Sequence, residues 1–240
     1  MLFSRQKGKA VMLSKNTLFV ILTLFLAAAP AAASTGIEQC AEIYRKNPPK
    51  VNITYNYGAL KYDATKTSEE LDKIYETISH GKPTHNIHGL TYLEPNVTTS
   101  VKMKSELLDD MSYCFYPQFI EIKTWYNPTV YIANSLKNGT CRFNTTVRHE
   151  QTHLDLGHHA LYLFAKSLRQ AEPEILAAVK PVVENGTSFD GNKIVKDFTD
   201  AYHAQVKIYF ENFKKNLEKY NSIIDTDENY KDETNLCIQD

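Results

Sequence analysis

The pattern of apolar and polar positions divides the chain after residue 50 into a strand-rich part and a helical part. In the first part, apolar residues alternate with polar ones in short runs bounded by turn residues, which is typical of half-buried strands. One helix interrupts them, because Thr67 and Glu70 form a capping-box pattern before an apolar stripe that ends at Gly81. Strands are predicted at 51–57, 90–93, 97–103, 119–125 and 129–133.

From Asn144 onward the apolar spacing becomes that of helices. One stripe continues to about Ala171, after which Pro173 interrupts the pattern, and a long C-terminal helix is predicted at 192–220. The buried stripes are expected to contain Val147, Leu154, Leu161, Phe164 and Leu168, and then Val195, Phe198, Tyr202, Val206, Tyr209, Phe213 and Leu217. Strands followed by helices predict an α+β fold, with a small, mainly antiparallel sheet packed against both helices.

Residues 1–34 have the pattern of a secretory signal peptide. A basic start precedes an apolar run from Leu18 to Ala29, and Pro30 and small residues follow it. The run is too short to span a bilayer comfortably, and no second long apolar segment follows it. We therefore expect a signal peptide at 1–34, a single domain at 35–240 without a membrane span, and a secreted or periplasmic protein.

Charge argues against a nucleic-acid partner. All 28 acidic residues lie at or after Glu38, whereas four of the 27 basic residues lie in the expected signal peptide. The remaining chain is therefore acidic, and it contains no basic patch of the kind that binds phosphate backbones.

The four cysteines predict disulfides, because export gives access to an oxidising compartment. Their spacing is wrong for a zinc site of the CxxC type. Of the three pairings that four cysteines allow, the preferred one is Cys40–Cys237 with Cys114–Cys141. Five Asn-x-Thr sequons, which matter only if the source glycosylates exported proteins, occur at Asn52, Asn96, Asn138, Asn144 and Asn185.

The chemistry is concentrated in the HExxH sequence from His149 to His153, which lies in the first of the two long helices. Two histidines four residues apart lie one turn apart on a helix, so that both imidazoles can bind one zinc ion. Glu150 is not expected to be a ligand. It is placed to take a proton from a zinc-activated water, which makes it the candidate general base.

The residues just downstream of the motif do not identify a third zinc ligand. The sequence around Gly157, His158 and His159 resembles the extended metzincin motif, but the glycine is one residue late and no methionine follows the site. If the helix continues, both histidines face away from the ligands. Glu172 and Glu174 have nearly the spacing of the glutamate ligand in gluzincins, but a continuous helix would carry them almost 30 Å away.

The last helix offers the alternative source of a third ligand. If it returns antiparallel to the first, the level of His153 lies between about residues 200 and 212, where Asp200, His203 and Glu211 occur. Imidazole is a good zinc ligand, so His203 is preferred.

The strand at 129–133 could pair with an extended peptide, as a strand beside the motif helix does in zincins generally. Tyr126, Tyr131 and Tyr162 are candidate donors to an oxyanion.

Several segments together resemble a bacterial family of predicted secreted zinc-dependent proteases of unknown function. They are Tyr55-Asn56-Tyr57-Gly58, then Asn138-Gly139-Thr140-Cys141 leading into Arg148-His149-Glu150-Gln151-Thr152-His153, and the tail Ile224-Asp225-Thr226. The resemblance implies a zincin-like domain at 35–240 that hydrolyses peptide bonds in a peptide or protein substrate. The competing interpretation is a non-catalytic exported protein that binds metal, or a disulfide-tied envelope protein without metal.

Overall fold

The computed structural model describes residues 35–237 except 80, 84–85 and 187, so that the signal peptide expected at 1–34 lies outside the described residues. Ser34–Asp240 form one compact unit. Within the described part of that unit, no helix is both long and apolar enough to cross a bilayer.

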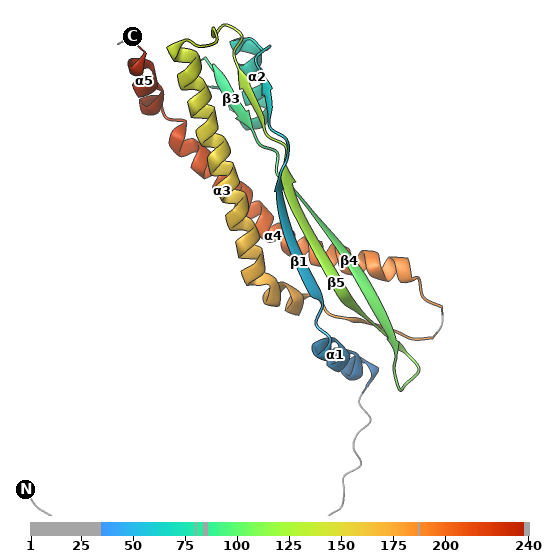
Figure 1. The fold of residues 1–240 in the computed structure, drawn as a ribbon. Coiled ribbons are helices and arrows are strands. Elements are labelled where there is room, and N and C mark those ends of the chain that lie inside the picture. The colour runs from blue at the N-terminus through green and yellow to red at the C-terminus, as the bar shows by residue number, and fades with distance from the viewer. Residues whose placement is uncertain (1–34, 80, 84–85, 187, 238–240) are drawn as a thin grey trace, which may run out of the picture. The chain divides into compact units, whose positions relative to one another are not determined.

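Five helices and seven strands make up the described residues (Figure 1). The helices are α1 (Gly36–Lys46), α2 (Ser68–Ser79), α3 (Cys141–Ala178), α4 (Gly191–Ile224) and α5 (Asp227–Leu236). The strands are β1 (Lys50–Tyr57), β2 (Lys61–Asp63), β3 (Gly89–Tyr92), β4 (Asn96–Leu107), β5 (Tyr113–Tyr126), β6 (Thr129–Ile132) and β7 (Val182–Glu184).

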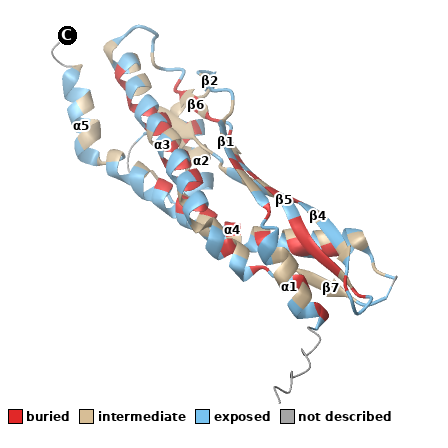
Figure 2. Ribbon diagram, turned by 60° about the horizontal axis from the view of Figure 1, so that its bottom comes forward, coloured by how far each residue is buried: buried red, intermediate tan, exposed pale blue. Residues whose placement is uncertain are grey.

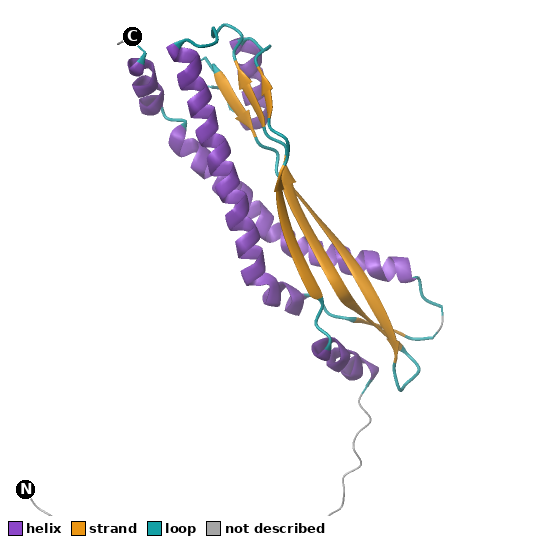
Figure 3. Ribbon diagram, viewed as in Figure 1, coloured by secondary structure: helices purple, strands orange, loops and turns teal. Residues whose placement is uncertain are grey.

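The strands form two sheets in place of the single sheet expected, although the α+β class is confirmed. The larger sheet has the order β1-β5-β4, with β7 also paired to β5, and the smaller has the order β2-β6-β3. Each strand of the smaller sheet is joined by a short connection to its counterpart in the larger one (Figure 3). The sheets are mixed: β1 pairs with β5 and β2 with β6 in parallel, whereas the other three pairings are antiparallel.

The main core lies between the larger sheet and the paired helices α3 and α4 (Figure 2). The predicted helical stripes supply much of it: Leu161, Phe164 and Leu168 from α3 are buried there, as are Phe198, Tyr202, Val206, Phe213 and Leu217 from α4. The smaller sheet packs on the first half of α3, where Val130 and Ile132 meet Leu154. The HExxH segment is therefore held rigidly against a sheet.

Helix α3 is longer than the sequence pattern suggested. Pro173 lies inside it, although proline removes one helical hydrogen bond, and the helix continues to Ala178. Ile175 and Val179 are buried in the main core, and this burial holds the last turns in place. The difference matters because the length of α3 determines which part of α4 faces the HExxH motif.

Both disulfides differ from the pairing preferred on sequence grounds, which was wrong. Cys40 pairs with Cys114, and Cys141 pairs with Cys237. The first bond fastens α1 to β5 within a small buried cluster. The second fastens the end of α5 to the first residue of α3, so the two termini of the domain are not tied to each other.

Candidate metal centre

The two histidines of the motif point to a common centre from the buried face of α3. His149 is 5% exposed and His153 is 7% exposed. Their Nε2 atoms lie 3.2 Å apart, one helical turn from each other. The expectation that both imidazoles converge is met.

Asp225, the residue that ends α4, supplies the third group. Its Oδ1 lies 3.2 Å from Nε2 of His149 and 3.0 Å from Nε2 of His153. Three ligand atoms bound at the usual distances around a tetrahedral zinc are about 3.3 Å from one another. All three separations in this triad are close to that value, so His149, His153 and Asp225 form a group that could hold a metal ion.

Hydrogen bonds to the Nδ1 atoms of the two histidines orient their rings so that the Nε2 atoms face each other. Nδ1 of His149 lies 3.0 Å from Oε1 of Glu233, and Nδ1 of His153 lies 3.1 Å from Oδ1 of Asn221. Since both partners are acceptors, the proton of each Nδ1 points outward and each Nε2 points inward. Two imidazole nitrogens and a carboxylate then meet at one point, an arrangement that a proton or a metal ion satisfies.

The proton affinities of the triad reflect the same concentration of negative charge. Burial lowers the pKa of His149, but the hydrogen bond with Asp225 and the charge of Glu150 outweigh it and raise that pKa to about 9. Burial raises the pKa of Asp225, yet hydrogen bonds from the two histidines hold that pKa well below its usual range. The site therefore binds positive charge firmly, as protons or as a metal ion.

Glu150 lies beside the triad and is outside the ligand group. It is 3% exposed, and Oγ1 of Thr91 donates a hydrogen bond of 2.7 Å to its Oε2. The pKa of Glu150 is raised, mainly because the carboxyl group is buried. A Cβ atom on Gly89 would lie 2.5 Å from Oε1 of Glu150, so that β3 can approach this carboxylate only with glycine at that position.

Helix α5 closes one side of the triad. Tyr230 donates a hydrogen bond of 3.0 Å to Oδ1 of Asp225, and its ring lies 4.9 Å from that of His149. Glu233 comes from the same helix. Because α5 has no buried residue, its position depends on these contacts and on the disulfide from Cys237 to Cys141.

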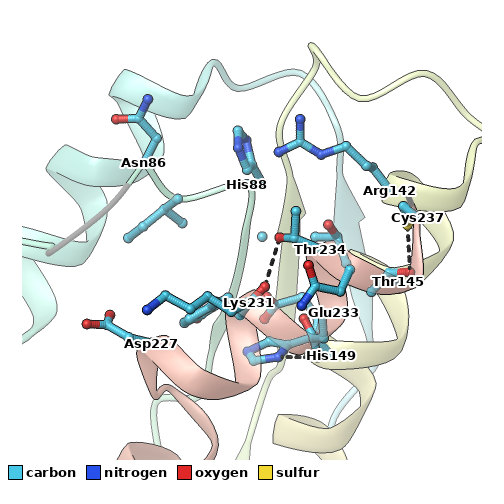
Figure 4. Close-up of a pocket in the computed structure, with 16 residues that line it drawn as sticks. Asn86, His88, Arg142, Thr145, His149, Asp227, Lys231, Glu233, Thr234 and Cys237 are labelled. Carbon is cyan, nitrogen blue, oxygen red and sulfur yellow. Dashed lines mark hydrogen bonds and ion pairs between the residues drawn. The ribbon is translucent and has the colours of Figure 1, made fainter. Parts of the chain in front are cut away.

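Two cavities flank the triad and meet beside Glu150. The first, of about 560 Å³, lies under α5 (Figure 4). The second, of about 650 Å³, extends between β3 and the last turns of α4. Both are lined by Ile87, Gly89, Glu150 and Tyr230. The arrangement is a cleft with the metal group and the buried carboxylate at its middle.

The structure does not bring His203 to the other ligands. Its Nδ1 lies 3.0 Å from Oγ1 of Thr99 on β4. The other two candidates on α4 make ion pairs on their own helix, Asp200 with Lys196 and Glu211 with Lys214. The residues that contact His153 are Asn221 and Asp225, near the end of α4, and the extension of α3 beyond Ala171 accounts for part of this shift.

The candidates on α3 also lie away from the centre. The helix continues through Gly157, as expected if the metzincin motif is absent. The ring of His158 lies 4.1 Å from that of Tyr57, and His159 is exposed. Glu172 and Glu174 follow five turns further along the same helix and are not in the metal group.

The strand at 129–133 does not have the role expected for it. It corresponds to β6, the central strand of the smaller sheet, and both of its edges are already paired. The strand that lines both cavities is β3, an edge strand of that sheet. None of the expected oxyanion donors, Tyr126, Tyr131 and Tyr162, lines either cavity, whereas Tyr230 lines both.

Sequence reasoning missed Asp225, Tyr230 and Glu233 as members of the site. The sequence does place Asp225 just after the last apolar turn of the long final helix, where a helix end leaves a side chain free to turn inward. For Tyr230 and Glu233 no apolar stripe or motif gave a signal.

The carboxylate of Glu233, which bonds to His149 from outside the triad, gives a direct prediction. Glu233→Gln keeps the size of the side chain but removes the charge that holds Nδ1 of His149 protonated. We expect zinc affinity, measured by competition with a chromophoric chelator, to fall about tenfold. Asp232→Asn, on the exposed side of α5, is the control and should leave the affinity unchanged. Equal affinities in the two variants would contradict a role for Glu233.

The two disulfides make a matched pair for a second prediction. Replacing Cys141 and Cys237 by serine should release α5, lower zinc affinity about tenfold and expose 226–237 to limited proteolysis. Replacing Cys40 and Cys114 by alanine should instead reduce the free energy of unfolding by about 2–4 kcal/mol and leave zinc affinity unaltered. The prediction fails if both pairs of substitutions affect zinc affinity equally.

Comparison of the chain with protein-family models, with curated proteins and with solved structures finds no match. The site's geometry is therefore the main basis for assigning a function.

Proposed function

We propose that this protein is a zinc-dependent peptidase that acts after export from the cytoplasm. The observation that carries the proposal is the triad of His149, His153 and Asp225, with mutual separations of 3.0 to 3.2 Å, beside the buried carboxylate of Glu150. Two imidazoles and one carboxylate are a ligand set that catalytic zinc uses. Calcium and magnesium prefer sites made of oxygen alone.

His149, His153 and Asp225 would hold the zinc, and three is the number of protein ligands that catalytic zinc sites use. Zinc bound there supplies an acidified water and polarises a carbonyl group. Glu150, which is next to the ligands without being one of them, would accept the proton of the attacking water and pass it to the leaving amine.

A peptide substrate is favoured by the strand beside the cleft. β3 pairs with β6 along one edge only and lines both cavities, so an extended chain could lie along it across Glu150. Tyr230 lines both cavities from α5, so that a chain bound along β3 would lie next to it. The resemblance to secreted zinc-dependent proteases points to the same activity.

Export is supported by the leader-like start of the sequence and by the two disulfides. The site depends on one of these bonds to hold α5, so we expect it to be complete only in an oxidising compartment.

The test is purification without chelators, followed by metal analysis and an assay with unfolded protein substrates. We expect about one zinc per chain, hydrolysis that stops on chelation, and recovery when zinc is restored. Zinc without hydrolysis of any peptide would indicate a non-catalytic metal-binding protein. A purified chain that binds no zinc would indicate a disulfide-tied structural protein and overturn the proposal.

A further inference from the structure

The carboxylate of Glu150 is almost enclosed by protein, and one residue of β3 binds it. Glu150 is 3% exposed, and Oγ1 of Thr91 donates a hydrogen bond of 2.7 Å to its Oε2. Among the residues that the structure describes, Thr91 is the only one that forms a hydrogen bond with this carboxylate. Because the last torsion of a glutamate side chain has only broad preferences, the orientation of the carboxylate depends on this bond.

The hydroxyl group of Thr91 is itself held in place by α3. Its Oγ1 lies 3.1 Å from the backbone carbonyl oxygen of Glu150, as well as 2.7 Å from Oε2. A hydroxyl group carries one proton, and the closer, charged oxygen takes the larger share of it. The carbonyl group is fixed by the helix, so the contact with it sets the distance between β3 and α3 at this point. Thr91 is therefore a firm support for the carboxylate.

The second carboxylate oxygen of Glu150, Oε1, faces Gly89. A Cβ atom on Gly89 would lie 2.5 Å from Oε1, so the absence of a side chain there leaves room for this oxygen. Gly89 and Thr91 are two residues apart on β3 and face the same side of the strand, toward α3. Both Gly89 and Glu150 line the two cavities. Since Thr91 binds Oε2, Oε1 is the oxygen left to meet a group in the cleft.

From this geometry we infer that Thr91 is a positioning residue for the general base of the proposed reaction. Its hydroxyl group holds Oε2 of Glu150, so that Oε1 is oriented to accept the proton of the attacking water. A carboxylate that is free to turn would spend only part of its time in that orientation, and reaction rates are sensitive to such misplacement. This inference rests on the proposed peptidase activity and adds a residue that acts through Glu150.

The test replaces Thr91 by valine, which has the same shape but no hydroxyl group. In the zinc-loaded variant, kcat for a peptide substrate should fall about tenfold, because a hydrogen bond to a charged group is lost. KM and zinc content should stay within about twofold of the wild-type values, because Thr91 is not in the metal group. Thr91→Ser, which keeps the hydroxyl group and loses the methyl group, should restore kcat.

The serine variant separates positioning from packing. If Thr91 mattered only as a packed side chain, Thr91→Val would be harmless and Thr91→Ser would be the damaging change. A low kcat in Thr91→Ser with a normal kcat in Thr91→Val therefore overturns the inference, as does a wild-type kcat in both variants. Thr91→Ala also lacks the hydroxyl group and replaces Thr91→Val in the comparison if the valine variant does not fold.

Thr99 on β4 provides the matched control. Its Oγ1 lies 3.0 Å from Nδ1 of His203, so Thr99→Val also removes one partly buried hydrogen bond from a strand. Thr99 lines neither cavity, and kcat should remain at the wild-type value.

A double variant tests whether Thr91 acts through Glu150. If it does, Thr91→Val combined with Glu150→Gln should hydrolyse peptides as slowly as Glu150→Gln alone. A further loss of activity in the double variant would show that Thr91 acts on the reaction independently of Glu150, contrary to the inference.

Binding of acetohydroxamic acid separates this inference from the peptidase proposal. Its two oxygens chelate zinc, and its hydroxyl proton can be shared with a carboxylate beside the ion. Calorimetry with zinc-loaded protein should show about tenfold weaker binding to Thr91→Val than to the wild type, and equal binding to Thr91→Ser. If no peptide is cleaved but this difference is found, the peptidase proposal fails and the positioning of Glu150 stands. If peptides are cleaved and Thr91→Val matches the wild type in both measurements, the positioning inference fails alone.

Discussion

Asp225→Asn is expected to remove zinc from the protein under conditions in which the wild-type chain holds about one ion. The substitution keeps the shape of the side chain and removes the only carboxylate in the triad. Since loss of an outer-shell partner already costs about 10- to 100-fold in metal affinity, loss of a direct ligand should lower affinity by more than about a hundredfold. Metal analysis after gel filtration, together with chelator competition, measures the effect.

The controls for Asp225 come from the residues that sequence reasoning had favoured. His203→Gln and Asp200→Asn change candidates on the same helix that the structure places elsewhere. Both variants should retain zinc with wild-type affinity. If His203→Gln loses the metal and Asp225→Asn keeps it, the triad described above is not the metal site.

Glu150→Gln is expected to retain zinc and to lose hydrolysis. The glutamine keeps the size and the hydrogen bond from Thr91, but it cannot accept a proton. General acid–base catalysis contributes about 10²- to 10⁴-fold, so kcat should fall by at least about a hundredfold. Peptide hydrolysis and zinc content, measured on the same preparation, give the two readouts.

Glu228→Gln is the control for that experiment, since Glu228 is exposed on α5 and lines neither cavity. It should leave both hydrolysis and zinc content at wild-type levels. Simultaneous loss of zinc and activity in Glu150→Gln would mean that Glu150 is a ligand, contrary to the geometry.

Local features of the site were predictable because they depend on local geometry. The spacing of His149 and His153 fixes their relation once the segment is helical, and the apolar stripes of α3 and α4 identified the faces that are buried. The third ligand depends instead on tertiary structure. The predicted end of α3 at Ala171 was about two turns short, because Pro173 interrupts the apolar pattern. That error accounts for only part of the distance between His203 and Asp225, which are about six turns apart.

The smaller helices were missed for a different reason. Helix α5 has no buried side chain, so it contains no apolar stripe. Helix α1 has a short one, in which Cys40 is buried and Ile43 and Tyr44 are partly buried, but the helix is only 11 residues long. Both are held by disulfides. Without α1 and α5, no predicted contact favoured one cysteine pairing over another, and the preferred pairing was incorrect.

The disulfide that joins α5 to α3 also determines when the metal site can be completed during biosynthesis. A ribosome completes the histidines of α3 well before Asp225, Tyr230 and Glu233, and the bond from Cys141 to Cys237 spans 96 residues. In a reducing compartment that bond does not form, and α5 has no buried surface to hold it in place. Under the proposed function, the metal site is thus complete only after the chain has been finished and oxidised.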